Sequence, residues 1–130
     1  MATASILGGS NLIAFVHITD WERARAFYQD LLGLRLVEEE KPFALVFDAN
    51  GIMLRVTPGG EHKLAPSTVL GWAVEDIVDT VERLSAAGIQ FLRYPGLNEA
   101  DPHGIWAAPG GARVAWFHDP DDNVLSLTQF

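Results

Sequence analysis

Cysteine is absent from the 130 residues, which excludes disulfides, thiolate metal sites and cysteine nucleophiles. Basic residues are also few: 9 lysines and arginines stand against 17 acidic residues, and the formal net charge is −8. Nucleic acid is therefore not an expected partner, because phosphate binding needs a basic surface. No apolar run approaches the roughly 20 residues of a membrane helix, so we expect no membrane partner either.

The first ten residues lack the basic start and the long apolar core of a signal peptide. The Gly8-Gly9-Ser10 run predicts a flexible leader over residues 1–10 instead. These features together predict a cytoplasmic protein. The 48% hydrophobic content is that of an ordinary globular chain, and the length suits one compact domain.

The first part of the chain predicts a strand, a helix and three further strands. Residues 11–19 are rich in β-branched and aromatic types, as strands are. Asp20 is expected to cap a helix with one apolar face, which Gly33 ends. The short strands that follow are predicted over residues 34–39, 43–48 and 51–57.

The same order of elements then occurs a second time. After a turn-rich linker over residues 58–67, a strand is predicted over 68–74, followed by an Asp76 cap and a helix that ends at Gly88. Further strands are predicted over residues 89–94, 114–117 and 124–127, and a polar loop leads from the first of them to Ile105-Trp106-Ala107 and a Pro-Gly-Gly turn. The sequence therefore predicts an α+β fold of two tandem βαβββ modules, residues 11–57 and 68–130. They must share one core because a single module cannot bury its own sheet.

Two motifs in these modules carry a resemblance to a known family. Residues 19–34, with Asp20, Phe27-Tyr28 and Leu32-Gly33, resemble the Asp-x6-Phe-Tyr-x3-Leu-Gly helix of the vicinal oxygen chelate superfamily. That group holds glyoxalase I, extradiol dioxygenases, fosfomycin-resistance enzymes and bleomycin-resistance proteins. Residues 117–123 resemble its Phe-x-Asp-Pro-Asp-Gly-Asn turn, with Asp122 in place of the glycine. Aspartate is one of the few residues that accept positive φ, so the turn should persist.

The resemblance covers nearly all of residues 11–130 and implies more than the pattern alone. It implies curved mixed sheets around a cup, with the helices on the convex side. It also implies a homodimer, whose cups are shared or completed across the interface in many members.

Metal-using members supply His and Glu side chains from four strand positions to one divalent ion. The resemblance places these positions at Ile13, Met53, Val69 and Ser126, none of which is a good metal ligand. We therefore expect no family-type metal site and no cofactor. A displaced metal site built from His17, His103 and an acidic residue is the alternative.

Strand alternation indicates which side chains line the implied cup. The residues expected there are Ile13, Phe15, His17, Met53, Arg55, Val69, Gly71, Ala73, Val114, Trp116, Val124, Ser126 and Thr128. Such a mostly apolar lining with a few polar groups is typical of a small-molecule pocket, although a filled core has the same composition. The candidate ligand-binding residues are Phe15, His17, Met53, Arg55, His103, Trp106, Trp116 and Ser126.

Each candidate with a specific role also has a plain structural interpretation. His17 could act as an acid, a base or a donor, or be a hydrogen-bonded core histidine. Arg55 could bind a carboxylate or phosphate, or pair with one of the glutamates at 38–40. Trp116 could stack on a planar ring or simply fill space. His103 and Trp106 border a loop expected to cover the mouth of the cup.

Two functions are compatible with these residues. The first is a metal-free binding protein of the glyoxalase/bleomycin-resistance type that holds a small, partly aromatic or anionic molecule. The alternative is a lyase, isomerase or dioxygenase that uses a displaced metal or His17 as general base. The sequence leaves open whether the protein is an enzyme.

Overall fold

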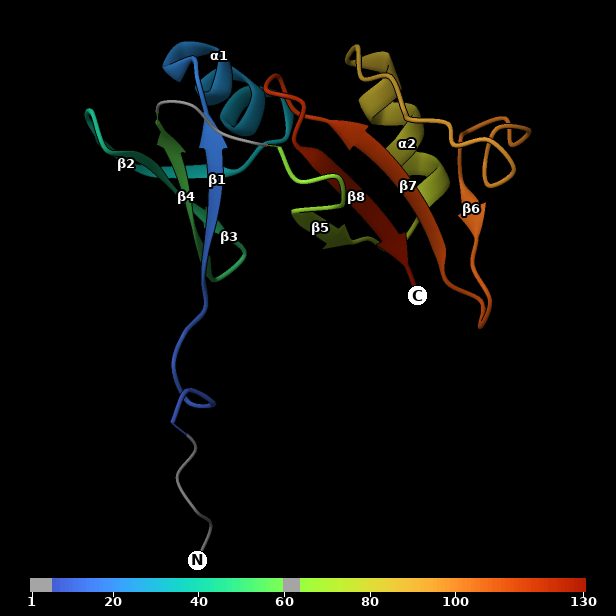
Figure 1. Cartoon of the computed structure of the whole chain (residues 1–130), viewed down its shortest axis with the longest axis horizontal. Helices are drawn as coiled ribbons and strands as arrows, with labels where there is room; N and C mark the ends of the chain where they lie inside the picture. Colours follow the sequence, from blue (N-terminus) through green and yellow to red (C-terminus); the bar gives the residue numbers. More distant parts are fainter. Residues whose placement is uncertain (1–5, 60–63) are drawn as a thin grey trace, which may run out of the picture.

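The computed structural model describes residues 6–59 and 64–130 and has the predicted α+β architecture (Figure 1). It contains two four-stranded mixed sheets and two helical segments. Sheet A has the strand order β1 (Ile13–Ile18), β4 (Ile52–Pro58), β3 (Ala44–Ala49), β2 (Arg35–Glu40). Sheet B has the order β5 (Leu70–Ala73), β8 (Val124–Gln129), β7 (Arg113–His118), β6 (Trp106–Ala107). Residues 1–5 of the predicted leader and 60–63 of the predicted linker lie outside the described residues.

Both helices begin and end as the sequence predicts. The Asp20 carboxylate accepts a 3.0 Å hydrogen bond from the Arg23 amide at the start of α1 (Trp21–Arg25), and Asp76 caps α2 (Ile77–Ala86) in the same way. Gly33 and Gly88 follow the two helices with φ of +77° and +102°, values that glycine adopts without steric cost.

The first helix changes its winding after one turn. It continues from α1 as the π-helix η1 (Ala26–Leu31), in which the Leu32 amide bonds to the Phe27 carbonyl five residues earlier. Phe27 and Tyr28 lie in this segment and are both buried. The sequence pattern predicted a helix here without distinguishing its type.

The predicted strand over residues 89–94 is reduced to a single bridge. Phe91 pairs with Phe117, and the Leu92 amide donates to the Trp116 carbonyl. Pairing stops there because the Tyr94 amide donates instead to the side-chain oxygen of Asn98, at 2.7 Å. The chain therefore leaves β7 and enters the loop that precedes β6.

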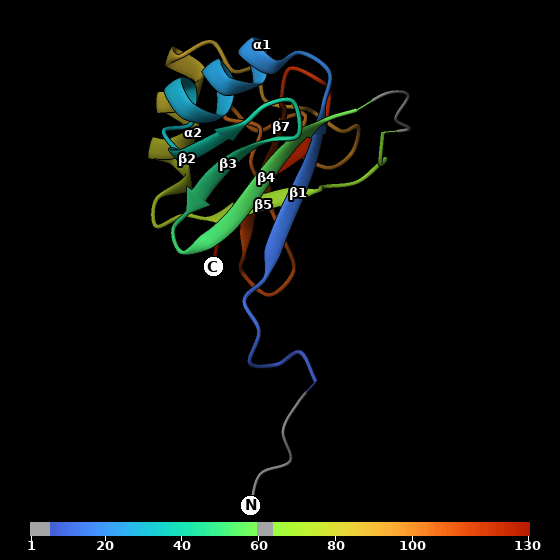
Figure 2. The ribbon, with the colours of Figure 1, turned by 90° about the vertical axis from the view of Figure 1, so that its left-hand side faces the viewer.

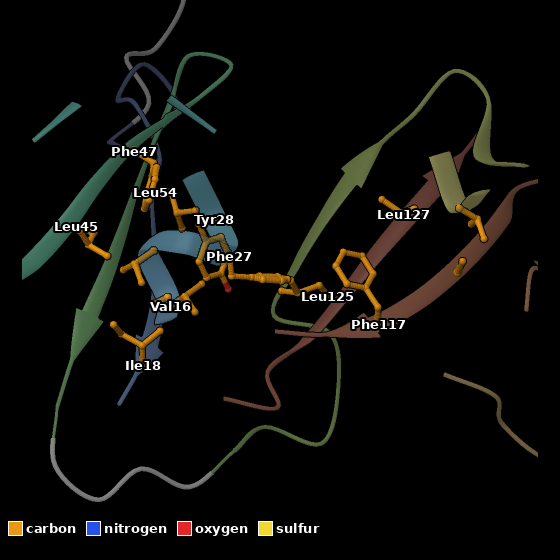
Figure 3. Packing of buried hydrophobic residues seen from close by; sticks show 14 of the residues in the cluster. Val16, Ile18, Phe27, Tyr28, Leu45, Phe47, Leu54, Phe117, Leu125 and Leu127 are labelled. Atoms are coloured by element: carbon orange, nitrogen blue, oxygen red, sulfur yellow. The ribbon is translucent and has the colours of Figure 1, made fainter. Parts of the chain in front are cut away.

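The hydrophobic core lies between the two sheets and is shared by them (Figure 3). The Phe27 ring stacks on Phe117 of sheet B at 6.5 Å, and the Tyr28 ring lies 6.1 Å from Phe47 of sheet A. The segment η1 thus joins the inner faces of both sheets. The buried residues around it include Val16, Ile18, Leu45, Leu54, Val56, Ile77, Val81, Ala115, Leu125 and Leu127.

Each sheet consequently has an inner face in the core and an outer face that carries the alternate residues. Figure 2 shows sheet A from its outer side, with sheet B behind it, so this outer face points away from sheet B. The side chains predicted to line one cup therefore occupy two separate outer faces within a single chain. Ile13, Phe15, His17, Met53 and Arg55 belong to sheet A, and Val114, Trp116, Val124, Ser126 and Thr128 to sheet B.

Candidate ligand-binding site

The outer face of sheet A is apolar and open. Ile13 pairs with Met53 and Phe15 with Arg55 across the parallel strands β1 and β4. Phe15 is 61% exposed, and Ile13 and Met53 are more than two-fifths exposed. A group of large apolar side chains with this exposure is typical of a surface that another molecule covers.

Arg55 lies on this face but already has an acidic partner. Its Nη2 atom is 2.7 Å from Glu40 Oε1 on the edge strand β2. Pairing with one of the glutamates at 38–40 was one of the two interpretations of Arg55, and the structure contains that pair. An anionic ligand would have to compete with Glu40 for the guanidinium.

His17 lies at the far end of β1, opposite Thr57. Its carbonyl accepts a 2.8 Å hydrogen bond from the Asn123 side-chain amide. The imidazole lies against Gly59, where an added Cβ would come within 2.8 Å of Nε2. The backbone of His17, near the end of β1, is thus bonded to the turn that precedes β8, while its imidazole contacts Gly59.

The outer face of sheet B carries the other candidates in a row across the strands. Gly71 on β5 pairs with Ser126 on β8, and Ser126 pairs with Trp116 on β7. The Trp116 ring is stacked with that of Trp106, with centroids 6.0 Å apart and planes inclined by 28°. Tyr94 meets Trp116 edge-on at 5.4 Å. Sheet B therefore presents an aromatic cluster of Tyr94, Trp106 and Trp116, which we name the aromatic wall.

Tyr94 was not among the candidates chosen from the sequence. The sequence places Tyr94 at the end of the strand predicted over 89–94. Its contact with Trp116 could not be predicted, because it depends on the loop that begins there.

That loop is held by the side chains of Asn98, which is buried, and Arg93, which is exposed. The Asn98 amide nitrogen donates to the carbonyls of Leu92 and Gly104, at 2.9 and 2.7 Å, and Asn98 is 2% exposed. The Arg93 guanidinium donates to four loop carbonyls, those of Asn98, Glu99, Asp101 and Pro102. The loop is therefore fixed from within, and it fixes the two ends of the aromatic wall.

Asp101 completes the loop from its own side chain. Its Oδ2 atom accepts hydrogen bonds from the backbone amides of His103 and Ile105, both at 2.9 Å. Burial acts to raise the pKa of Asp101, but these amides and the nearby charges of His103 and Arg113 outweigh it and leave that pKa below its usual value. The ionised carboxylate is the form that the loop stabilises.

His103 lies beside α2. Its Nε2 atom is 3.4 Å from Glu82 Oε2, and both residues line a groove together with Val81, Ser85 and Phe91. The residues that line this groove do not include Trp106, Trp116 or Ser126. His103 therefore faces α2 across this groove.

The sequence of residues 13–127 matches the family model of the Glyoxalase/Bleomycin resistance protein/Dioxygenase superfamily. The match spans most of the chain and both modules. The chain belongs to this superfamily. No curated protein matches the sequence significantly.

Several solved structures share the fold over nearly the whole chain. A protein assigned to the glyoxalase family from Bacillus anthracis superposes with a TM-score of 0.76 at 15% identity, covering 98% of both chains. Lactoylglutathione lyase from Agrobacterium tumefaciens gives 0.72 at 16% identity, over 95% of both chains. TioX from Micromonospora sp. ML1 gives 0.69 at 20% identity, over 93% of this chain and 98% of that one. At these identities the likeness concerns the fold alone.

The four positions that the sequence resemblance assigns to the superfamily's metal ligands carry side chains with little capacity to bind an ion. In sheet A, Ile13 and Met53 face each other in register, and neither offers a nitrogen or oxygen side-chain donor. In sheet B, the residue opposite Ser126 is Gly71, two positions beyond Val69. Among residues 6–59 and 64–130, no three His, Asp or Glu side chains are grouped to bind a metal ion. The four side chains thus lack the chemistry of the superfamily's metal centre.

Within the described part of the chain, none of the helices has the length and apolar character needed to cross a membrane.

Proposed function

We propose that this superfamily member binds a small aromatic molecule on the outer face of sheet B and does so without a metal ion. The observation that carries the proposal is the aromatic wall of Tyr94, Trp106 and Trp116, held in place by the loop around Asn98. Indole rings offer a large flat apolar surface on which a planar ligand stacks. A rigid wall of this kind lowers the entropy cost of binding.

The four superfamily metal positions support a metal-free role. Ile13, Met53 and Val69 are apolar, and Ser126 offers one neutral hydroxyl. A catalytic metal in such sites is held by imidazole nitrogens and carboxylates. The ligand would therefore be recognised by aromatic contacts and hydrogen bonds from this chain.

We further propose that two copies of the chain associate and complete the site. The outer face of sheet A is apolar and exposed at Ile13, Phe15 and Met53, yet it points away from sheet B in its own chain (Figure 2). A second copy can place this face over the aromatic wall of its partner, which would enclose a ligand between the two. Phe15 and the Arg55–Glu40 pair would then form the opposite side of the site.

A ligand screen tests the proposal directly. Purified protein is screened by thermal shift against small planar aromatics, with Trp116→Leu as the test variant and Trp21→Leu, on α1, as the matched control. Hits are expected to stabilise the wild type and the control but not Trp116→Leu. Binding that survives in Trp116→Leu would refute the assignment of the site.

Elemental analysis tests the metal-free part of the proposal. The protein is purified without chelator, exposed to nickel, zinc, manganese and iron, and dialysed. We expect retention far below one ion per chain. Near-stoichiometric retention that is lost in His17→Ala would instead support the enzymatic alternative with a displaced metal.

A further inference from the structure

The inner face of sheet A is filled at one end and open at the other. Ile18 on β1 and Val56 on β4 are fully buried, whereas Leu12, just before β1, is 69% exposed and Ile52 on β4 is 41% exposed. Strand alternation places all four on the inner face. Figures 1 and 2 show α1 at the buried end of the sheet and the β3–β4 turn at the open end. The apolar lining therefore continues beyond the region that the helix fills.

A cavity of about 400 Å³ occupies this open end, and β5, the edge strand of sheet B, closes it from the other side. The two sheets contribute apolar residues, among them Ala14, Ala49, Ile52, Leu54, Leu70 and Trp72. Asn50, exposed in the β3–β4 turn, adds a polar side chain, and no charged side chain of the described residues lines the space. We name it the inter-sheet cavity.

Two alanines make room for this cavity. The inner positions that precede or follow Ala14 and Ala49 along the same strands carry Val16 and Phe47, which are 3% and 0% exposed. Side chains of that size at positions 14 and 49 would extend the packed core into the cavity. Both β1 and β3 are hydrogen-bonded to β4 along their length, so the wall cannot move inward without disturbing the sheet.

The inter-sheet cavity is separate from the aromatic wall. Tyr94, Trp106 and Trp116 do not line it. Trp116 also alternates along β7 with Ala115 and Phe117, which are fully buried on the inner face. A molecule in the cavity would therefore leave the aromatic wall free.

We propose that the inter-sheet cavity is a second ligand site, which takes a flat, uncharged and mostly apolar molecule of one or two rings. Its volume lies at the lower end of the roughly 300–1,000 Å³ of small-molecule sites. A charged ligand would lose its hydration without gaining a partner in this lining. A flat ligand fits because the walls are faces of two sheets, and Trp72 offers an indole surface on one of them. This site is additional to the proposed function, and neither depends on the other.

Two probes with the same ring system test the requirement for an uncharged ligand. N-phenyl-1-naphthylamine is uncharged at pH 7, and 8-anilino-1-naphthalenesulfonate carries a sulfonate on the same rings. Both fluoresce more strongly in apolar surroundings, so each is titrated with the full-length protein. In about 0.5 M salt, which screens the net charge of −8, the uncharged probe should bind at least about tenfold more tightly. Equal binding of the two probes, or no binding of the uncharged one, would overturn the inference.

Ala49→Leu fills the cavity and should weaken binding of the uncharged probe at least about tenfold. Ala86→Leu, the same exchange at an exposed position of α2, is the matched control and should bind as the wild type does. Ala14→Val adds a smaller group to the same space and should weaken binding by a smaller factor, so it serves as the test if Ala49→Leu does not fold. Thermal midpoints show which variants are folded, and wild-type affinity in a folded Ala49→Leu or Ala14→Val contradicts the site.

Trp116→Leu distinguishes the two sites and should leave the affinity for the uncharged probe unchanged. Loss of binding in Trp116→Leu together with its retention in Ala49→Leu would place the probe on the aromatic wall, which overturns this inference and supports the proposed function. An affinity that falls as the protein concentration rises would mean that a second copy of the chain covers the cavity, and this too would overturn the inference.

Discussion

The hydroxyl of Tyr28 donates a 2.7 Å hydrogen bond to Asp119 Oδ2, across 91 positions of sequence and inside the core. Asp119 also accepts from the amides of Asp121 and Asn123, and the Asn123 side chain reaches on to the carbonyl of His17. Tyr28 belongs to the Phe-Tyr helix motif and Asp119 to the Asp-Pro-Asp turn. The two motifs that revealed the family are therefore in contact, and they fasten the β7–β8 hairpin to the first module.

Replacing Tyr28 by phenylalanine should destabilise the protein by about 1.5–3 kcal/mol, the usual range for a hydrogen bond to a charged group. Urea unfolding at pH 7 measures this. The matched control is Tyr94→Phe, which removes a hydroxyl from a residue that is 37% exposed and should cost less than about 0.5 kcal/mol.

The same variant should change the response to alkali. Burial, together with the Asp119 charge and hydrogen bond, raises the pKa of Tyr28 far above its ordinary value near 10. Because the folded pKa is raised, the stabilisation is complete below the unfolded pKa and is lost as pH rises beyond it. Above about pH 10 the wild type should lose about 1.4 kcal/mol per pH unit more than Tyr28→Phe. Parallel pH profiles of the two proteins would contradict this account.

Asp122 occupies the glycine position of the turn with φ of +64°, as the sequence predicts for an aspartate that tolerates this region. Asp122→Val should cost about 1–2 kcal/mol, because a β-branched residue is strained there. Asp122→Gly should be within about 1 kcal/mol of the wild type, since relief of strain and greater unfolded-state freedom oppose each other. The thermal midpoints of the two variants measure these differences. Equal stability of the valine and glycine variants would contradict backbone strain at this position.

The caps, glycine stops and turn were predictable because each depends on residues close in sequence, such as Asp20 with Arg23 or Asp119 with Asn123. The strand over residues 89–94 was not, because its pairing is ended by Asn98, a loop residue whose burial depends on tertiary structure. Alternation along β1 also predicted that Phe15 and Val16 lie on opposite faces, and Phe15 is 61% exposed while Val16 is 3% exposed. Alternation assigns a residue to one face of its own sheet but does not show how two sheets are oriented. It therefore could not predict that the outer faces of sheets A and B lie apart within one chain.

Asn98→Ala should destabilise the protein by about 2–4 kcal/mol, because it leaves the carbonyls of Leu92 and Gly104 without their buried donor. The near-ultraviolet circular dichroism of the aromatic wall should weaken as well, since the loop holds Tyr94. Gln90→Ala, at an exposed site nearby, is the control and should change neither signal. Unchanged stability in Asn98→Ala would mean that the loop is not held by this side chain.

Asp101 should contribute to acid sensitivity. Its pKa is lowered in the folded protein, so its stabilisation is complete above the unfolded value near 3.9 and is lost as pH falls toward the folded one. Asp101→Asn should therefore be less stable than the wild type at pH 6, and the difference should shrink as pH falls below 4. Stability curves at a series of pH values check this, and a difference that does not change with pH would exclude the carboxylate charge as its cause.

Phe15 provides the test of the proposed dimer. The side chain is 61% exposed on the outer face of sheet A, and burying such a ring against a second copy would contribute about 1.5–3 kcal/mol. Phe15→Ser should therefore raise the dimer dissociation constant at least tenfold in sedimentation equilibrium, while the monomer fold, which does not use this face, keeps its thermal midpoint. Phe130→Ser is the matched control, because Phe130 is 92% exposed at the chain end beyond β8. A wild type that sediments as a monomer, or equal effects of both variants, would contradict a dimer formed through the outer face of sheet A. In that case the aromatic wall would bind its ligand without a second copy covering it.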